Sequence, residues 1–596
     1  MSFRLRAIRP ARCMGFGMLF AAIAYLLWTS VQTVGGRTEG MGRGDALLFG
    51  FLPWLGVVSG MVFVLFRRTV QVVWLDVCLA GWWLYYLGNA WIVSDVPCGT
   101  DLLRHSGLWM LYFSLRVVWA QSGVSRRTVC RIAAALLAIC GGYEAWIGLC
   151  QLYGDEPSLH DRYPLTGSFF NPGPYSAYLA VAWSVCVAYL VGRNLDGLRI
   201  SVFSSWQRGL CFCLFLGMCM ALPATWSRAA FIACAVVWLF LFGPRYRRYW
   251  PWALGIAVGG SVLLYFLKQG SADSRLLIWA VSLRAWGDSL WWGEGIGGFF
   301  RIFSEKQTLF FHSHTDAFWT ASAGVPDYAF NELLKIGVEQ GIIGVLFALA
   351  AAGMVGRRLW LSFRPLAYGW LALCVFALFS YPFSLLPFQL LAVLFAFLSA
   401  ATGSRQKGVF RLRPVWGIPL VGMSIAAGFW LNRAVAPRVE AAREYALLAG
   451  LNDRTFLKDY EAMYPALNDN PYFLFDYGKM LRGQNRFNDS NALLQEGAML
   501  SCDPMFLVLM GHNYRSLGAP RMAEESYQKA FSLLPNRMYP LYCLLDFYVS
   551  EGDTDRAMER ARQICRFSPK ISSKATEEMQ RKAREYMKNR KWGKTD

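Results

Sequence analysis

The sequence is poor in charge and rich in apolar residues. Charged residues make up only 16% of the 596 residues, against about 25% in an average globular protein, while 55% are hydrophobic. This balance excludes a soluble protein, and the chain is too long for a single domain. The composition therefore indicates a multi-spanning membrane protein.

Metal-binding patterns are also lacking. The chain has only five His, and its fifteen Cys never form a C-x-x-C pair. Most of these Cys lie inside apolar runs, where Cys behaves as a small buried hydrophobe. The segments that we place outside the membrane lack the clustered carboxylates that bind magnesium. We therefore expect no metal, no cofactor and no disulfide framework.

The net charge of +20 would be typical of a nucleic-acid-binding protein in a soluble chain. Here, however, much of the Lys and Arg lies in short loops between apolar runs, where positive charge sets the orientation of membrane helices. We therefore expect membrane lipids, and no nucleic acid, among the partners.

Thirteen apolar runs approach the ~20 residues that cross a bilayer. They lie at 14–33, 46–66, 70–92, 102–121, 130–151, 173–192, 209–224, 229–243, 249–267, 341–356, 365–380, 383–401 and 415–432. The first run follows four Arg and could be a signal peptide, but no convincing cleavage site follows it, so we predict a retained span.

The loops between these runs alternate in charge, which tests the count independently. With the N-terminus in the cytoplasm, the inner loops hold Arg67, Arg68, Arg126, Arg127, Arg131, Arg193, Arg199, Arg208, Arg245, Arg247, Arg248, Arg357, Arg358, Arg364, Arg405, Lys407, Arg411 and Arg413. The short outer loops hold only Arg37, Arg43, Arg104, Arg162 and Arg228. This bias predicts that residues 152–172, 268–340 and all those after about 433 lie outside the cytoplasm.

Residues 434–596 have a different character, with frequent charges and no long apolar run. Self-similarity at 33 to 34 residues predicts stacked helix pairs of the tetratricopeptide type. The best repeat holds Leu507, Met510, Gly511, Tyr514, Ala523, Tyr527, Ala530 and Pro535, and a shift of 34 reaches Leu541, Leu544, Leu545, Tyr548, Ala557, Ala561, Ile564 and Pro569. We expect this tail to bind a protein partner or present an acceptor; plain scaffolding is the alternative.

Three outer segments carry polar groups at the membrane edge, where such groups are functional candidates. The first holds Arg162 in a loop whose Asn171 and Pro172 are typical of a helix start. The second holds Arg228, which could equally snorkel to lipid headgroups. The third begins with Arg275 and continues into a Trp-rich amphipathic run that includes Arg284, typical of a helix in the membrane interface.

Several Arg at one membrane face suit a lipid-linked diphosphate. Guanidinium groups pair bidentately with phosphate oxygens, and the pairing strengthens where water is scarce. They would also stabilise a diphosphate leaving group without a metal. Nucleotide donors would be on the wrong side of the membrane.

Four motifs follow one another in this part of the chain. They are R-x-P-L-T-G-S-F-x-N-P from Arg162, T-W-S-R-A-A from Thr225, S-R-x-x-I-W from Ser274 followed by G-E-G-I-G-G-F from Gly293, and F-N-E-L-L-K-I-G-V-E-Q-G-I-I-G from Phe330. Their order resembles the O-antigen ligase family, whose superfamily includes O-antigen polymerases and protein O-oligosaccharyltransferases. The resemblance covers roughly residues 130–400, and the tail resembles those appended to some members.

The resemblance implies an all-α chain. Residues 1–433 would form a polytopic membrane bundle of the lipid-donor (GT-C) type, with residues 268–340 as a large periplasmic loop, and residues 434–596 would form a periplasmic tetratricopeptide-like domain. The protein would lie in the bacterial inner membrane and transfer a glycan from undecaprenyl diphosphate to an acceptor without a metal. Arg228 and Arg275 match the family's diphosphate-binding arginines, and Arg162 would assist.

The general base is left open by the sequence. Family members often carry His-Asn where this chain has Phe330 and Asn331, and that His is the expected base. We therefore name Glu332, Asn331 and Asp327 as the catalytic candidates, with His312 and His314 as further possibilities brought in by the loop. Glu332, Lys335 and Glu339 also share one helix face, so surface ion pairing is an alternative interpretation.

Three functions are consistent with these sequence features. The first is a glycan ligase or oligosaccharyltransferase that acts on a lipid core or on protein hydroxyls. The second is a polymerase that uses the same donor with a second lipid-linked glycan as acceptor. The third is a non-catalytic transporter or membrane scaffold, which the absence of clear inverted repeats disfavours.

Overall fold

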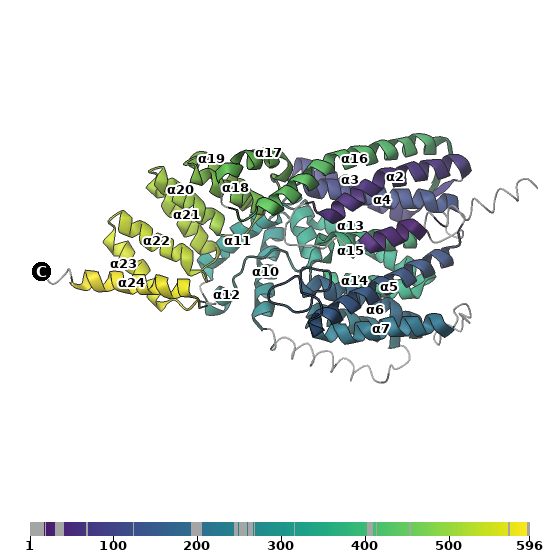
Figure 1. Ribbon diagram of the computed structural model, residues 1–596, viewed down its shortest axis with the longest axis horizontal. Coiled ribbons are helices and arrows are strands. Elements are labelled where there is room, and N and C mark those ends of the chain that lie inside the picture. The colour runs from purple at the N-terminus through teal and green to yellow at the C-terminus, as the bar shows by residue number, and fades with distance from the viewer. Residues whose placement is uncertain are drawn as a thin grey trace, which may run out of the picture.

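A computed structural model shows how these segments are arranged (Figure 1). It describes residues 17, 20–29, 41–66, 69–122, 124–191, 205–242, 248, 255, 259, 266, 269–314, 316–401, 409–412, 414–451, 454–569 and 572–592. The predicted span at 249–267 lies outside this set, apart from three isolated residues.

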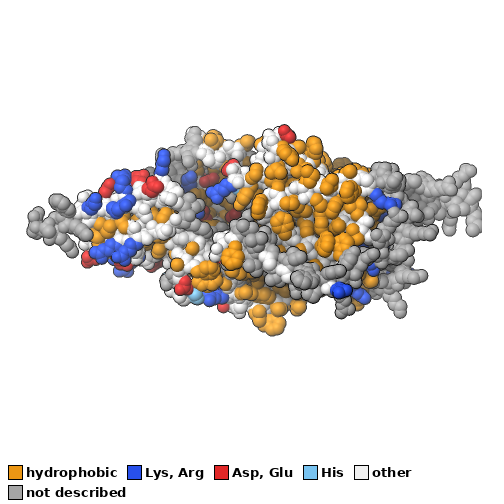
Figure 2. Space-filling view, turned by 90° about the horizontal axis from the view of Figure 1, so that it is seen from below, with side chains coloured by type: hydrophobic (Ala, Val, Ile, Leu, Met, Phe, Trp, Pro, Cys, Tyr) orange, Lys and Arg blue, Asp and Glu red, His pale blue; other side chains and the backbone are white. Residues whose placement is uncertain are grey.

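Long helices lie side by side in one half of the molecule (Figure 1). They are α2 (Arg43–Phe66), α3 (Trp74–Ile92), α4 (Gly99–Ser122), α5 (Arg126–Tyr153), α6 (Pro172–Val191), α7 (Ser205–Ala224), α8 (Arg228–Phe242), α13 (Glu332–Ser362), α14 (Arg364–Ala377), α15 (Leu386–Ala400) and α16 (Pro414–Leu448). Figure 2 shows a broad hydrophobic surface over this half, whereas charged side chains gather on the other half. This arrangement is that of a membrane helical bundle.

Four described helices are long and apolar enough to cross a membrane, at Arg43–Phe63, Arg126–Tyr153, Pro172–Val191 and Glu332–Ser362. Five shorter apolar helices accompany them, at Phe20–Thr29, Arg208–Ala224, Arg228–Phe242, Arg364–Ala377 and Leu386–Ala400. These helices confirm a membrane protein, while the count of thirteen spans stays a prediction.

Close packing in the bundle depends on small residues. Helix α6 is the most enclosed of the four long apolar helices, with residues such as Ala177, Ala180 and Ala182 almost fully buried. A Cβ atom added to Gly141 of α5 would lie 2.3 Å from the Cβ of Ala182, so only glycine allows this approach. Small residues at a helix interface let backbones approach and maximise van der Waals contact. The result is a rigid support for the N-terminus of α6.

One pair of strands departs from the all-α prediction. Strands β1 (Val70–Val72) and β2 (Phe410–Leu412) pair antiparallel, with Val70 opposite Leu412. The predicted span at 70–92 therefore starts with a strand, and its helix begins only at Trp74. The β-branched valines favour this extended segment, and the Arg116 guanidinium holds it by donating to the Gln71 carbonyl (2.7 Å). The chain is nearly, but not entirely, helical.

Three further helices form the outer segment, α10 (Gln269–Asp288), α11 (Phe299–Ser313) and α12 (Ala317–Ser322). They lie between the bundle and the tail (Figure 1). The amphipathic run predicted from Leu276 is part of α10, and Trp291 and Trp292, just beyond its end, are exposed. The predicted interface helix therefore exists as a helix.

Helix α13 is broken at Gly341, where φ is +64°. The loop before α11 provides hydrogen-bond partners for backbone groups on both sides of the break. Glu294 N donates to Val338 O (2.8 Å), and Ile342 N donates to Leu290 O (2.8 Å). A Cβ at Gly341 would lie 2.2 Å from the Trp291 carbonyl oxygen, which explains the glycine. The break falls where the sequence predicts the tenth span to begin, so residues 332–340 form a separate helical segment of about two and a half turns.

Helical hairpins make up the tail. They are built from α17 (Leu457–Leu467), α18 (Pro471–Gly483), α19 (Phe487–Leu500), α20 (Met505–Ser516), α21 (Pro520–Leu533), α22 (Met538–Ser550), α23 (Thr554–Arg566) and α24 (Lys574–Trp592). Equivalent contacts recur, since a Cβ at Gly478 would lie 2.9 Å from Leu494 and one at Gly511 would lie 2.4 Å from Tyr527. Both pairs shift by 33 residues, which agrees with the predicted repeat; the tetratricopeptide assignment itself stays a prediction.

Helix α16 joins the two halves of the molecule. It runs without interruption from Pro414 to Leu448 and so passes through the predicted domain boundary at 433/434. The tail is therefore connected to the bundle by a continuous helix rather than by a flexible linker.

Candidate active site at one end of the helical bundle

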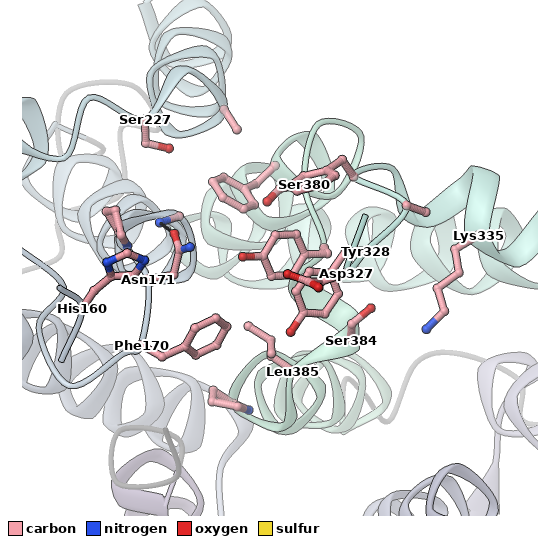
Figure 3. A pocket seen from close by; sticks show the side chains of 18 of the residues that line it. His160, Phe170, Asn171, Ser227, Asp327, Tyr328, Lys335, Ser380, Ser384 and Leu385 are labelled. Atoms are coloured by element: carbon pink, nitrogen blue, oxygen red, sulfur yellow. Dashed lines mark hydrogen bonds between the residues drawn. The ribbon is translucent and has the colours of Figure 1, made fainter. Parts of the chain in front are cut away.

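A cavity of about 1170 Å³ opens where one end of the helical bundle meets the segment that holds α10, α11 and α12. Its walls come from the N-terminal ends of α2, α6, α8, α10, α13 and α15, the loop that precedes α6, and the loop that precedes α13. Figure 3 shows His160, Phe170 and Asn171 on one side and Lys335 on the other, with Asp327 and Tyr328 between them. The cavity thus combines all three outer segments that the sequence singled out.

Arg275 enters this cavity from α10. Its Nη1 donates to the Phe379 carbonyl (3.0 Å), and its guanidinium carbon lies 4.9 Å from the centre of the Phe330 ring. Burial first, and then the positive charge of Arg228, lower the pKa of Arg275 to about 10. The guanidinium therefore stays charged at neutral pH although its environment disfavours the charge.

Arg228 lines the same cavity from the first residue of α8. Its Nη2 donates to the Ser271 hydroxyl (3.3 Å), and Asp273 is the carboxylate that interacts with its charge. The positive charges of the two arginines are close enough for Arg228 to contribute to the lowered pKa of Arg275. Two like charges held together at one wall create a strong site for an anion.

Arg162 differs from these two arginines, because it is exposed and is not among the described residues that line the cavity. Its backbone N donates to His160 Nδ1 (3.0 Å), and His160 and Tyr163 on either side of it do line the cavity. The same loop is held to α5 by Ser168, whose hydroxyl donates to Glu144 Oε1 (2.5 Å). The loop is therefore part of the site even though Arg162 itself is not among the described lining residues.

Asp327 lines the cavity beside a stack of aromatic rings. The Tyr328 and Tyr381 rings lie parallel, with centroids 3.7 Å apart, and Phe330 meets Tyr381 edge-on at 5.3 Å. Phe330 has φ of +52°, an unfavourable conformation for a bulky residue. Such strain persists only where the surroundings impose it, and it clusters at functional sites.

A second strained residue lies beside Arg228. Trp226 has φ of +49°, lines the cavity and is 56% exposed. It sits in the turn between α7 and α8, where its backbone N donates to Pro223 O (3.2 Å). The strained turn thus carries a large aromatic residue of the cavity lining two positions before Arg228.

Asn331 and Glu332 have structural contacts. Asn331 caps α13, because its Oδ1 accepts from Leu333 N (3.0 Å) and Leu334 N (3.1 Å). Glu332 is only 6% exposed, and its Oε1 accepts from Ser384 N (3.1 Å). Neither residue is among the described residues that line the cavity. Glu332 and Glu339 are both buried, so the alternative of a surface ion-pairing face is wrong.

The remaining candidates lie on the outer segment away from the cavity. His312 is exposed near the end of α11, and the His314 ring stacks on Phe310 with centroids 4.2 Å apart. Arg284 lies over the same Phe310 ring at 4.6 Å. None of these three is among the described residues that line the cavity.

Several lining residues were not singled out by the sequence as site residues. Lys335 lies three residues after Glu332, and its charge interacts with the carboxylates of Glu339, Asp101 and Glu332. Asp45 and Arg104 line the cavity as a salt bridge with Nε to Oδ1 at 2.8 Å. Arg104 is one of the few arginines in the predicted short outer loops, whereas no sequence pattern pointed to Asp45.

Comparison with known families bears on this part of the chain. Residues 213–349 match the family model described as O-antigen ligase. This segment is similar to O-antigen ligases. The resemblance inferred from the sequence is confirmed over it, and the segment contains Arg228, Arg275 and Asp327. At the level of the family, the match supports a ligase-like or polymerase-like glycosyltransferase in a membrane.

Other comparisons add little. No curated protein matches the chain. Among solved structures, a crystal structure of the APC/C hetero-tetramer Cut9-Hcn1 is 12% identical, covers 88% of this chain and 98% of that chain, and has a TM-score of 0.19. A score this low carries no argument about fold or function.

Proposed function

We propose that the protein transfers a glycan from undecaprenyl diphosphate to an acceptor hydroxyl on a lipid core or a protein. The transfer takes place at the periplasmic face of the inner membrane. The observation that carries this proposal is the pair of charged arginines, Arg228 and Arg275, on one wall of a large cavity inside a segment similar to O-antigen ligases. Their guanidinium groups would bind the diphosphate through paired hydrogen bonds.

The reaction needs no metal in this scheme. The acceptor oxygen forms a bond to the anomeric carbon of the donor sugar, and the bond from that carbon to the diphosphate oxygen breaks. Negative charge then develops on the leaving diphosphate, where Arg228 and Arg275 stabilise it most strongly. The glycan moves to the acceptor, and undecaprenyl diphosphate is released.

The proton of the acceptor hydroxyl would pass to Asp327. This carboxylate lines the cavity, whereas Glu332 already accepts a backbone hydrogen bond outside its lining, and the position before Asn331 holds Phe330. A general base must come within hydrogen-bond distance of the hydroxyl, which favours the carboxylate that faces the cavity. Asn331 and Glu332 would then position the loop that carries Asp327.

The orientation in the membrane is part of the proposal. The helix ends away from the cavity carry basic residues, such as Arg126 at the start of α5, Arg358 near the end of α13 and Arg364 at the start of α14. Positive charge favours the cytoplasmic side. We therefore propose a bacterial inner-membrane protein with its cavity and tail in the periplasm.

The test uses purified full-length protein in nanodiscs, a fluorescent undecaprenyl-diphosphate oligosaccharide, and EDTA. Lipid A–core and a Ser-containing polypeptide are offered as acceptors, and the donor serves as its own acceptor in a third reaction. We expect label transfer that Arg228→Ala reduces at least 100-fold. Arg284→Ala is the matched control, since Arg284 is an outer arginine to which we assign no role.

The labelled product separates a ligase, a protein transferase and a polymerase. Asp327→Asn should reduce transfer more than Glu332→Gln under the same conditions, which tests the base. If wild-type protein binds the donor and no acceptor becomes labelled, a carrier or scaffold replaces the enzyme as the better interpretation.

A further inference from the structure

The tail contributes directly to the cavity. Tyr472, the second residue of α18, lines it together with residues of the membrane bundle. Its side chain is 43% exposed, while the next residue, Phe473, is fully buried in the core of the tail. A soluble repeat domain that only tethered a partner would have no reason to place an aromatic ring in this cavity.

Contacts on one side fix this part of the tail to the bundle. Asp469 Oδ2 accepts from the backbone N of Thr100 at the start of α4 (2.7 Å) and from Arg438 Nη1 of α16 (3.0 Å). Val96, just before α4, is buried in the same apolar cluster as Phe473. The N-terminus of α18 is therefore locked to α4 through both polar and apolar contacts.

A second set of contacts fixes the tail to the outer segment. Gln307 Nε2 of α11 donates to the Leu533 carbonyl (2.7 Å), and Asn536 Nδ2 donates to the Ala323 carbonyl (2.7 Å). The buried Cys502 and Leu534 belong to the same apolar cluster as α10 and α11. With two separate attachments, the tail cannot rotate about α16, so Tyr472 is held in place.

Tyr472 follows Asp469, which bonds to Thr100 one turn before Arg104 on α4. Asp469 and Lys335 both interact electrostatically with Arg104, which places Lys335, Arg104 and the start of α18 near one another. Figure 3 shows Lys335 and Ser227, the residue before Arg228, on opposite sides of the cavity. Lys335 and the turn that carries Arg228 therefore lie on different sides of a cavity whose volume leaves room for a second ligand group.

The volume and chemistry of the cavity indicate what fills that space. Its 1170 Å³ exceeds the roughly 300–1,000 Å³ of a site for one drug-sized ligand. The wall near Tyr472 offers a phenol ring, the Lys335 ammonium and the Asp45–Arg104 pair. An aromatic face packs against the apolar C–H face of a sugar ring, while polar groups beside it bond to the hydroxyls.

We infer that Tyr472 is a sugar-binding residue through which the tail forms a glycan subsite of the cavity. The inference rests on the proposed function and adds a role for the tail in it. The sugar would belong either to the distal part of the donor glycan or to a carbohydrate acceptor, and these two sources share the same chemistry at Tyr472.

Binding is measured first, and independently of transfer. Saturation-transfer NMR is recorded with full-length protein in nanodiscs and a free oligosaccharide identical to that of the donor and, separately, a free core oligosaccharide. We expect at least one to bind wild-type protein, and Tyr472→Ala to weaken that binding about tenfold, while Tyr472→Phe retains it. Equal binding by wild type and Tyr472→Ala, or no sugar binding by wild type, would overturn the inference.

A matched control exists two repeats further along the tail. Tyr539 occupies the equivalent position in the first turn of α22, is 38% exposed and is not among the described lining residues. Tyr539→Ala should leave sugar binding unchanged. Thermal melting of both alanine variants shows whether either one affects folding, and a loss of binding in both would attribute the effect to the tail in general and contradict the specific role.

Transfer kinetics distinguish the two sources of sugar. If Tyr472 binds the donor glycan, Tyr472→Ala raises KM for an oligosaccharide donor and not for a donor with a single sugar. If it binds the acceptor, KM for lipid A–core rises with either donor, and kcat changes little. An effect confined to the polypeptide acceptor would overturn the sugar assignment, whereas absence of transfer by wild type would overturn the proposed function and leave the binding result standing.

Discussion

Arginines in the tail and arginines in the cavity have different partners. In the tail, Arg515 Nη1 lies 2.7 Å from Asp546 on the next hairpin, and Arg486 Nη1 lies 3.0 Å from Glu461. In the cavity, Arg275 donates to the Phe379 carbonyl and lies over the Phe330 ring. The tail arginines have counter-ions within the fold, whereas the two groups that contact Arg275, a backbone carbonyl and an aromatic ring, are neutral. The charge of Arg275 is therefore available to an anionic ligand.

Position in the cavity alone does not make an arginine functional. Arg104 also lines it, yet two of its nitrogens bond to Asp45 at 2.8 and 3.0 Å. Removing one partner of a buried ion pair leaves the other charge uncompensated and destabilises the fold, whereas removing a buried arginine that has only neutral contacts leaves no such charge. The following predictions test this difference.

The largest effect is expected at Arg275. Arg275→Ala should reduce glycan transfer about 100- to 1,000-fold, because it removes a charge that stabilises the leaving diphosphate. The melting temperature of the ligand-free protein should not fall, since the variant removes a charge that burial and Arg228 disfavour. Transfer assays and melting in the same detergent measure both. A large drop in melting temperature would show that Arg275 is structural.

Arg104 should behave in the opposite way. Arg104→Ala leaves the Asp45 carboxylate buried without this partner, which destabilises a protein by about 3–5 kcal/mol. Melting and the monodisperse fraction after purification measure the loss. The double variant Asp45→Asn/Arg104→Met should recover part of it, because both charges are then absent. Equal melting of Arg104→Ala and wild type would contradict the distinction.

His512 makes the stability of the tail depend on pH. Burial first, and then the positive charges of Arg482 and Arg515, lower the pKa of His512 to about 4. The unfolded chain, with a pKa near 6.5, therefore binds a proton that the folded tail does not bind between these values. Stability should fall as the pH decreases from about 6.5 towards 4, by on the order of 2 kcal/mol at pH 5.

Melting of the full chain at pH 7.5 and pH 5.0 measures this dependence. His512→Gln should reduce it, because glutamine does not titrate. A slope that is the same in the variant and the wild type would assign the pH dependence to other groups.

The smallest effect is expected at Arg486, which forms ion pairs on the surface of the tail. Arg486 lies between Glu461 and Asp489, and all three side chains are exposed. Exposed ion pairs are screened by water and salt and contribute little. Arg486→Ala should therefore leave both melting and transfer unchanged within error. A clear loss of stability would mean that ion pairs between hairpins hold the tail together.

Local patterns predicted much of the fold and part of the site. Apolar length and the alternation of basic loops predicted the helical bundle, and the 33-residue repeat predicted contacts such as Gly511 with Tyr527. The short motifs singled out Arg228 and Arg275, Asp327 was named as a candidate just before the last motif, and the structure brings all three to one cavity. These patterns are local in the sequence, so they can be recognised without knowledge of the tertiary fold.

Other parts of the site could not be predicted from local patterns. Asp45, Arg104 and Tyr472 reach the cavity from segments that are far apart in sequence, and none lies in the four motifs. Glu332 looked as suitable as Asp327, but its carboxylate accepts from Ser384 N. Which carboxylate faces an open space depends on how α13 packs against the segment after α14.

The sequence by itself determined the class of the molecule, its helices and the face where its chemistry is expected, because hydrophobic length, charge alternation and repeat spacing act within a few turns of chain. Only the tertiary structure decided which polar side chains are paired and which face the cavity. That distinction arises from contacts between distant segments, such as Asp45 with Arg104 and Tyr472 with the bundle, whose energies depend on burial and geometry that no local pattern encodes.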